Sequence, residues 1–264
     1  MDSESRSTPE PKIAPEVPAT AQPQPAAERK LLAPIWHTAL IVVIMLGNSY
    51  FTAKYLNISG SRLASSRTWD YLFTIGFELF LLLLVWLGLW MKKYSMRELI
   101  GGKWNKPEDF LMDVGIAIGF WFVSALILLG LAYLLGQVNE ASVNEMKQRL
   151  SGLIPRSGME LTIWISLSVI AGLVEEILFR GYLQKQIGVI AGNIYWGVIG
   201  SAVIFGAGHG YEGTKNMIRI AVFGAMFGAL AVWRKSLRPG MMAHAAQDTL
   251  AGVATYFMSR QGKF

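Results

Sequence analysis

The sequence predicts an all-α membrane protein, a polytopic bundle of about seven spanning helices, with six to eight possible. Of its 264 residues, 53% are hydrophobic and only 16% are charged, and the mean hydropathy is +0.38. A soluble domain of ordinary composition is less apolar and more highly charged. Each spanning helix needs about 20 mostly apolar residues, so the chain has room for one bundle.

The N-terminal residues differ from the rest of the chain. Residues 1–30 are rich in Pro, Ala, Ser and Glu and have almost no large apolar side chains, which is typical of a disordered tail. The first apolar run begins after Lys30 and is too long for a cleaved signal peptide, so we expect it to stay in the protein. Residues 31–264 are then a single membrane domain.

Seven apolar runs follow one another along the chain. The first three are strongly apolar, whereas the last four are shorter, richer in Gly and carry most of the polar residues. This difference predicts a lipid-facing first half and a second half packed around a functional site. The predicted spans are 31–55, 71–91, 110–135, 161–179, 194–208, 218–233 and 241–257. Residues 95–106, after the second span, read as an amphipathic connection at the membrane interface.

The positive charges predict the orientation of the bundle. With seven spans and the N-terminus inside, the inner loops collect more Lys and Arg than the outer loops, as cytoplasmic loops do. The expected inner set is Arg29, Lys30, Lys92, Lys93, Arg97, Lys103, Lys106, Arg234, Lys235 and Arg238. The outer set is Arg62, Arg67, Lys147 and Arg149. We expect a multi-pass protein of a bacterial plasma membrane with a cytoplasmic N-terminus. The net charge of +6 then faces lipid headgroups and not nucleic acid.

Two adjacent carboxylates lie inside the fourth predicted span. Glu175 and Glu176 point about 100° apart around a helix, so they face different surroundings. Arg180 follows Glu176 by four residues on the same face, and this spacing predicts an ion pair that neutralises both charges. Glu175 is left without a local cation. A partly desolvated carboxylate of this kind suits a general base.

Two histidines lie in the later spans, and both have polar or very small neighbours. His209 sits among glycines at the end of the fifth span, and His244 precedes Asp248 by four residues on one helix face. The zero cysteines exclude thiolate chemistry. Glu175, the two histidines and Asp248 predict a polar site that acts in one of two ways. Either the four residues position water directly without a cofactor, or they bind a metal such as Zn²⁺ that activates it.

These motifs together resemble a known family, the CAAX prenyl protease and bacteriocin-processing (CPBP, or Abi) family of membrane proteins. Its pattern is Glu-Glu-x-x-x-Arg, then Phe-x-x-x-His, then His-x-x-x-Asn or Asp, each on a late membrane helix. The resemblance covers residues 155–257, and all three motifs occur in order. The matching residues are Glu175, Glu176 and Arg180, then Phe205 and His209, then His244 and Asp248.

The resemblance implies a glutamate-dependent intramembrane endopeptidase that cleaves a peptide or lipidated-protein substrate. It implies that Glu175 and His209 activate water and that His244 and position 248 bind the oxyanion. Glu176, Arg180 and Phe205 support the site. An ionised Asp248 repels an oxyanion, unlike an asparagine amide. We therefore expect Asp248 to orient His244 or, in the metal alternative, to complete a ligand set.

One geometric difficulty follows from the order of the spans. Successive spans run in opposite directions, yet Glu175 and His209 both lie toward the C-terminal ends of theirs. Ideal spans of equal depth would separate them. The site therefore requires the fourth span to continue toward Gln186, or the fifth span to start inside the membrane or break near Gly197 and Gly200.

Other readings stay open at this stage. A proton-coupled carrier also uses Glu and His residues inside a bundle, but it predicts inverted repeats that the sequence does not display. A non-catalytic membrane scaffold of the same fold is the other alternative. Glu78 in the second span and Asp113 in the third either pair with a cation or line the site. His37, near the start of the first span, is expected to be interfacial and inert.

Overall fold

The described part of the chain is helical throughout its regular structure. The computed structural model describes residues 30–59, 67–142, 144 and 151–262. The predicted disordered tail therefore lies outside the described residues, apart from Lys30. The α-helices are α1 (Ile35–Ser59), α2 (Arg67–Met91), α3 (Met96–Ile100), α4 (Pro107–Leu134), α6 (Gly158–Glu175), α7 (Gln184–Ile190), α8 (Ile194–Gly208), α9 (Thr214–Arg234) and α10 (Arg238–Arg260). A π-helix, η1 (Glu176–Leu183), joins α6 to α7, and a short 3₁₀ helix, η2 (Gly210–Glu212), precedes α9.

Each of the seven predicted spans coincides with a helix, which confirms the all-α membrane class. Five helical segments are long and apolar enough to cross a bilayer: 35–54, 67–91, 107–134, 158–190 and 214–234. Helix α8, at 15 residues, is shorter than a full span, and α10 is less apolar because it carries the third motif. The five long apolar helices and the exposed apolar side chains of α4, such as Leu126 and Leu134, are those of an integral membrane protein.

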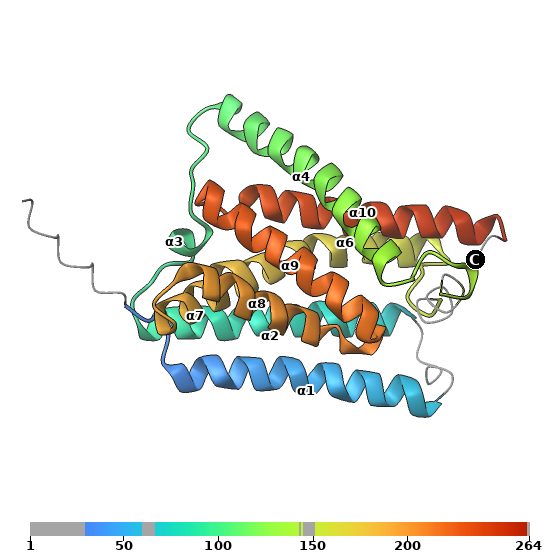
Figure 1. The fold of residues 1–264 in the computed structure, drawn as a ribbon, viewed down its shortest axis with the longest axis horizontal. Helices are drawn as coiled ribbons and strands as arrows, with labels where there is room; N and C mark the ends of the chain where they lie inside the picture. Colours follow the sequence, from blue (N-terminus) through green and yellow to red (C-terminus); the bar gives the residue numbers. More distant parts are fainter. Residues whose placement is uncertain (1–29, 60–66, 143, 145–150, 263–264) are drawn as a thin grey trace, which may run out of the picture.

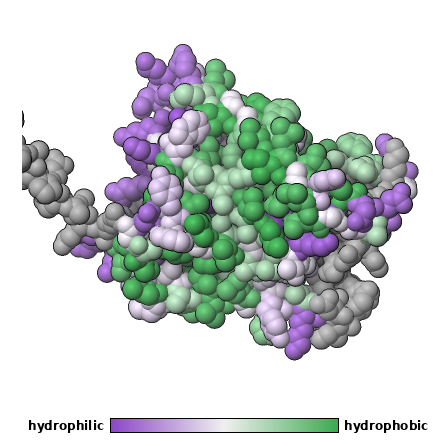
Figure 2. Space-filling view, viewed as in Figure 1, coloured by the Kyte–Doolittle hydropathy of each residue, from purple (hydrophilic) through white to green (hydrophobic). Residues whose placement is uncertain are grey.

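The long helices lie side by side along the length of the bundle (Figure 1). Helix α1 forms one edge of the bundle in this view, α4 crosses it obliquely at the other, and α6, η1 and α7 run through the middle. Hydrophobic residues cover most of the central part of this face, whereas hydrophilic residues gather toward its two ends (Figure 2). This division matches a bundle whose middle faces lipid.

The predicted inner cations gather at one end of the bundle. Helices α2 and α9 end there and α4 and α10 begin there, close to the short helix α3 (Figure 1). Ser95 and Glu98 cap α3 reciprocally, with Ser95 N donating to Glu98 Oε2 at 2.8 Å. The connection 95–106 thus contains a short capped helix whose Leu99 is buried. Arg67 begins α2 at the opposite end, and the other expected outer residues and Arg29 lie outside the described residues.

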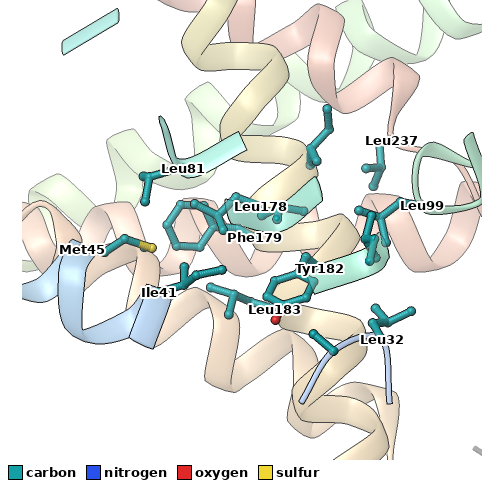
Figure 3. Packing of buried hydrophobic residues seen from close by; sticks show 14 of the residues in the cluster. Leu32, Ile41, Met45, Leu81, Leu99, Leu178, Phe179, Tyr182, Leu183 and Leu237 are labelled. Carbon is teal, nitrogen blue, oxygen red and sulfur yellow. The ribbon is translucent and has the colours of Figure 1, made fainter. Parts of the chain in front are cut away.

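The hydrophobic core is centred on the π-helix. All eight residues of η1 are buried, and its apolar side chains pack against α1, α2, α3 and the start of α10. Figure 3 shows Leu178, Phe179, Tyr182 and Leu183 of η1 surrounded by side chains from these elements. The segment that carries the first motif is therefore the most enclosed part of the bundle.

Helices α6 and α10 pack in close antiparallel contact through glycines. A Cβ atom added at Gly172 would lie 2.5 Å from the backbone nitrogen of Ala245, and one added at Gly252 would overlap the Trp164 ring. Trp164 Nε1 also donates to the carbonyl of Asp248 at 2.9 Å. Small residues allow membrane helices to approach in this way. This contact sets the positions of the first and third motifs relative to each other.

We expect Gly172→Ala to lower the free energy of unfolding by about 1–3 kcal/mol, the usual cost of overpacking, because the contacted backbone of Ala245 cannot move aside alone. Gly119→Ala in α4 is the matched control, since a Cβ there meets nothing within 4 Å. Thermal unfolding of the purified protein in detergent measures both. Equal stability of the two variants would contradict the packing described for α6 and α10.

Candidate active site

The fourth span continues well past the first motif. Helix α6, η1 and α7 form one uninterrupted helical segment from Gly158 to Ile190, so Glu175 lies near its middle. The predicted continuation toward Gln186 is confirmed. The alternative break in the fifth span is not observed, because α8 passes through Gly197 without interruption. Gly197 instead allows the α7 backbone to approach, with Gly188 N 2.9 Å from the position of an added Cβ.

This continuation brings His209 level with Glu175. From the turn at residues 191–193, the chain runs back 15 residues from Ile190 to Glu175 and forward 15 residues from Ile194 to His209. At about 1.5 Å per residue, each path is roughly 22 Å long. Since α7 and α8 run in opposite directions side by side, the two residues lie at similar depth. The geometric difficulty of the sequence is thereby removed.

A buried ion pair forms the base of the site. Arg180 Nη1 lies 2.9 Å from Glu176 Oε1, and both side chains are 1% exposed. The guanidinium also donates to the carbonyl of Gly224 and stacks over Phe205, with its carbon 4.4 Å from the ring centroid. The predicted ion pair is present, and both charges have additional partners in the apolar interior.

His244 rests on the same carboxylate. Its Nδ1 donates to Glu176 Oε1 at 3.2 Å, so one carboxylate accepts from both Arg180 and the histidine. Helix α10 approaches closely at this point, because a Cβ at Gly240 would lie 3.2 Å from Glu176 Oε2. Glu176 therefore orients His244, a role that was expected of Asp248.

The other ring nitrogen of His244 faces two further carboxylates. Its Nε2 lies 3.6 Å from Glu175 Oε2 and 3.6 Å from Asp248 Oδ2. The Glu175 side chain is 14% exposed and that of Asp248 is 35% exposed, against 1% for Glu176. The two adjacent glutamates thus occupy different surroundings, as their angular separation predicted. Glu175 is the glutamate that solvent or a substrate can reach.

His209 is held in a defined tautomer. Its Nδ1 lies 2.9 Å from the carbonyl oxygen of Phe205, four residues earlier. A carbonyl only accepts, so Nδ1 carries the proton and Nε2 of the neutral ring is an acceptor. The ring also packs edge-on against Phe205, with centroids 4.8 Å apart. The charge of Asp248 interacts with those of His209, Glu175 and His244, so His209 and the contacts of His244 belong to the same electrostatic neighbourhood.

Some residues of the site carry no motif and were missed from the sequence. Phe227 of α9 lies between the ion pair and His244, 5.0 Å from the Arg180 guanidinium carbon and with ring centroids 5.3 Å apart from His244. No pattern in α9 distinguishes this phenylalanine from a lipid-facing one. Glu212 could have been found from the sequence, because it is a carboxylate only three residues after a motif histidine, His209.

The segment η2 carries Tyr211 and Glu212 to the rim of the site. Burial raises the pKa of Glu212, while His209 and Arg219 act in the opposite direction and Asp248 adds to the rise. Burial also raises the pKa of the Tyr211 hydroxyl, and the nearby Glu212 and Glu175 carboxylates add to the effect. Tyr211 donates a hydrogen bond to Glu212. The burial of both side chains therefore favours their protonated forms.

The remaining polar residues of the spans take different places. Asp113 pairs with Arg234 at 2.8 Å and accepts from Trp104 Nε1 at 2.9 Å, so it ties α4 to the end of α9, away from the site. Glu78 lies on the side of α2 that faces Glu175 and His244. His37, near the start of α1, is buried among the helices, and its Nδ1 lies 3.1 Å from the Tyr182 hydroxyl.

The metal alternative would need several side chains arranged as ligands. Within the described residues, no group of three or more His, Asp and Glu side chains is arranged to hold a metal ion. Glu175, His209, His244 and Asp248 thus do not form a ligand cage in this structure. A separate cavity of about 260 Å³ lies between α3, α7 and α9, lined by residues that include Arg180, Gln184 and Lys185 but none of these four.

Comparison with known proteins bears on the same segment. Residues 157–250 match a family model described as type II CAAX prenyl endopeptidase Rce1-like. This segment is therefore similar to that family. The match confirms the resemblance drawn from the three motifs, and it contains all seven motif residues. Residues 1–156, with α1, α2 and α4, lie outside it. No match was found among curated proteins or among solved structures.

The buried ion pair of Arg180 and Glu176 leads to a prediction on the stability of the protein. We expect Arg180→Met to lower the free energy of unfolding by about 3–5 kcal/mol, because it leaves the Glu176 charge buried without a cation. The double variant Arg180→Met with Glu176→Gln should recover part of this loss. Arg234→Met is the control, since Arg234 is 23% exposed and its loss should cost less. A double variant as unstable as the single one would contradict the ion-pair account.

The raised pKa of Glu212 predicts how the stability of the protein depends on pH. Its pKa is raised in the folded protein, so its contribution to stability is fully present below the ordinary glutamate value, about 4.3, and is lost as pH rises through the folded value. We expect Glu212→Gln to become more stable relative to wild type as pH rises through this window. Thermal unfolding against pH measures the difference, with exposed Glu108→Gln as the control. A constant difference would contradict the assignment.

Proposed function

We propose that this protein is an intramembrane glutamic endopeptidase that hydrolyses a peptide bond of a membrane-associated peptide or lipidated protein. The observation that carries the proposal is His244, which contacts Glu175, Glu176 and Asp248 at 3.2–3.6 Å within an Rce1-like helical segment. Glu175 is the more exposed member of the glutamate pair, and no Lys or Arg among the described residues forms an ion pair with it. A bound water beside it would meet a base on one side and a hydrogen-bond donor on the other.

In the proposed reaction, Glu175 takes a proton from water as the water oxygen attacks the scissile carbonyl carbon. The Nε2 of His209, an acceptor in its tautomer, accepts the second hydrogen bond of the water and orients it. Glu175 then returns its proton to the leaving nitrogen as the C–N bond breaks. The products are a carboxylic acid and an amine, which become a carboxylate and an ammonium group when the acid's proton passes to the amine, and no other reactant is needed.

His244 is proposed to stabilise the oxyanion of the tetrahedral intermediate. Its Nδ1–H is occupied by Glu176, so its Nε2 is the nitrogen available to the substrate. The surrounding carboxylates favour the charged imidazolium, in which Nε2 also carries a proton. Asp248 then assists by holding the positive charge, not by touching the oxyanion. Phe205, Glu176 and Arg180 position these groups.

Orientation and compartment follow from the same proposal. The inner set of cations lies at the bundle end of α3, which favours that end as the cytoplasmic one and the N-terminus as cytoplasmic. A bacterial plasma membrane is the proposed location. Substrates would then reach Glu175 from the bilayer or from the end of the bundle at which η2 lies.

The test is cleavage of a quenched fluorescent peptide library, with lipidated members, by the purified protein in detergent. We expect Glu175→Ala and His209→Ala each to lower the rate about 10²- to 10⁴-fold, the usual contribution of a general base. Exposed Glu108→Ala is the matched control and should retain wild-type activity. Each protein is assayed with and without a strong chelator.

The outcomes separate the mechanisms. Activity that survives chelation and is lost in both variants supports the glutamic peptidase. Activity that is lost on chelation and restored by Zn²⁺ would move the proposal to the metal mechanism. No cleavage by the wild type, or cleavage unchanged in the variants, would favour the scaffold or the carrier.

A further inference from the structure

Glu78 is a buried carboxyl group outside the three motifs. It lies in the middle of α2, which the family match does not cover, and it is 8% exposed. Its Oε2 atom is buried and has no hydrogen-bond partner among the described residues. A carboxylate inside a membrane bundle is costly unless it is paired, protonated or functional. Asp113, the other acidic residue singled out in the first three spans, is paired with Arg234, whereas Glu78 is not.

The register of two helices places Glu78 beside Glu175. Helix α2 packs on α6 and η1 in the same direction, with the Tyr71 and Trp164 rings 5.4 Å apart at their beginnings. Further along, Leu81 of α2 lies next to Phe179 of η1 (Figure 3). Glu78 is one turn before Leu81, and Glu175 is one turn before Phe179. The two carboxyl groups therefore lie at the same depth of the bundle.

The electrostatic surroundings agree with this register. Glu78 interacts with the charges of Glu175 and His244, and it also acts on Tyr211. The titratable groups linked to it are therefore Glu175 of α6, His244 of α10 and Tyr211 of η2. His37 of α1 lies at Gly88, ten residues further along α2. Two neighbouring carboxyl groups away from water cannot both ionise easily, so one of them keeps its proton.

We propose that Glu78 is a positioning residue of the site, a protonated carboxyl that shares one proton with Glu175 and orients it toward the attacking water. Glu175, which is closer to His244 and more exposed, is the ionised member. The proton on Glu78 then reduces the repulsion between the two groups and can donate a hydrogen bond to Glu175 or to the water beside it. The catalytic part of this inference rests on the proposed peptidase function, whereas the shared proton does not.

The first experiment needs no enzymatic activity. Infrared difference spectra of the full chain in detergent, recorded along a pH titration, detect the C=O band of a protonated carboxyl group. We expect a band at neutral pH that is lost in Glu78→Gln. In Glu175→Gln the band should disappear about one pH unit lower or more, because the neighbouring negative charge is gone. Asp113→Asn is the control and should leave the band in place.

The second experiment uses the peptidase assay and separates positioning from folding. We expect Glu78→Leu to lower kcat about 100-fold, as a misplaced base does, and Glu78→Gln to lose less than tenfold because its amide can still donate. The rate of the wild type should also fall at alkaline pH, where Glu78 ionises, and this fall should be absent in Glu78→Gln. Thermal unfolding of both variants shows whether either has lost its fold.

The two experiments test the shared proton and the positioning role of Glu78 separately. A band whose intensity Glu78→Gln leaves unchanged, or no component that Glu175→Gln shifts, would overturn the shared proton. Equal losses of activity in Glu78→Gln and Glu78→Leu, with an unchanged pH profile, would overturn the positioning role. If the wild type cleaves nothing, the proposed function fails, and the spectra still test the pairing of Glu78 with Glu175.

Discussion

The structure depends on placing charges inside an apolar bundle. Glu176 and Arg180 are 1% exposed, and removing either would leave the other charge buried without its partner, which strongly destabilises a folded protein. Their neutralisation requires neighbours on every side: the Gly224 carbonyl and Phe227 from α9, Phe205 from α8 and His244 from α10. Four helices are thus held around one ion pair. The site is a consequence of how that pair is satisfied.

The chemistry follows from the same arrangement. Arg180 and His244 Nδ1 both contact Glu176. The other glutamate, Glu175, is partly exposed and lies beside Nε2 of the histidine. In the proposed function these two groups are the base and the hydrogen-bond donor, and they lie 3.6 Å apart. The π-helix that follows Glu175 has all eight of its residues buried. Glycines at Gly172 and Gly252 bring α10 close enough to deliver His244.

The N-terminal helices have a part beyond facing lipid. Helix α2 lies outside the Rce1-like segment, yet it runs parallel to α6 and carries a carboxyl group at the depth of Glu175. Helix α4 is attached by Asp113 and Arg234 at the opposite end from η2. The two acidic residues that looked alike in the sequence are therefore distinct. One belongs to a structural ion pair, and the other lies next to the proposed catalytic base.

Much of this protein was determined by local sequence alone. Composition and apolar runs predicted the membrane bundle and each of its main helices, because the need to satisfy backbone groups in lipid leaves few other folds. The spacing of Glu176 and Arg180 predicted their ion pair, because residues four apart meet on any helix. Only the tertiary structure decided which carboxylate holds His244, where Phe227 and Glu78 lie, and that the fourth segment extends to Ile190. These features depend on contacts between helices distant in the chain, and such contacts leave no periodic trace in the sequence.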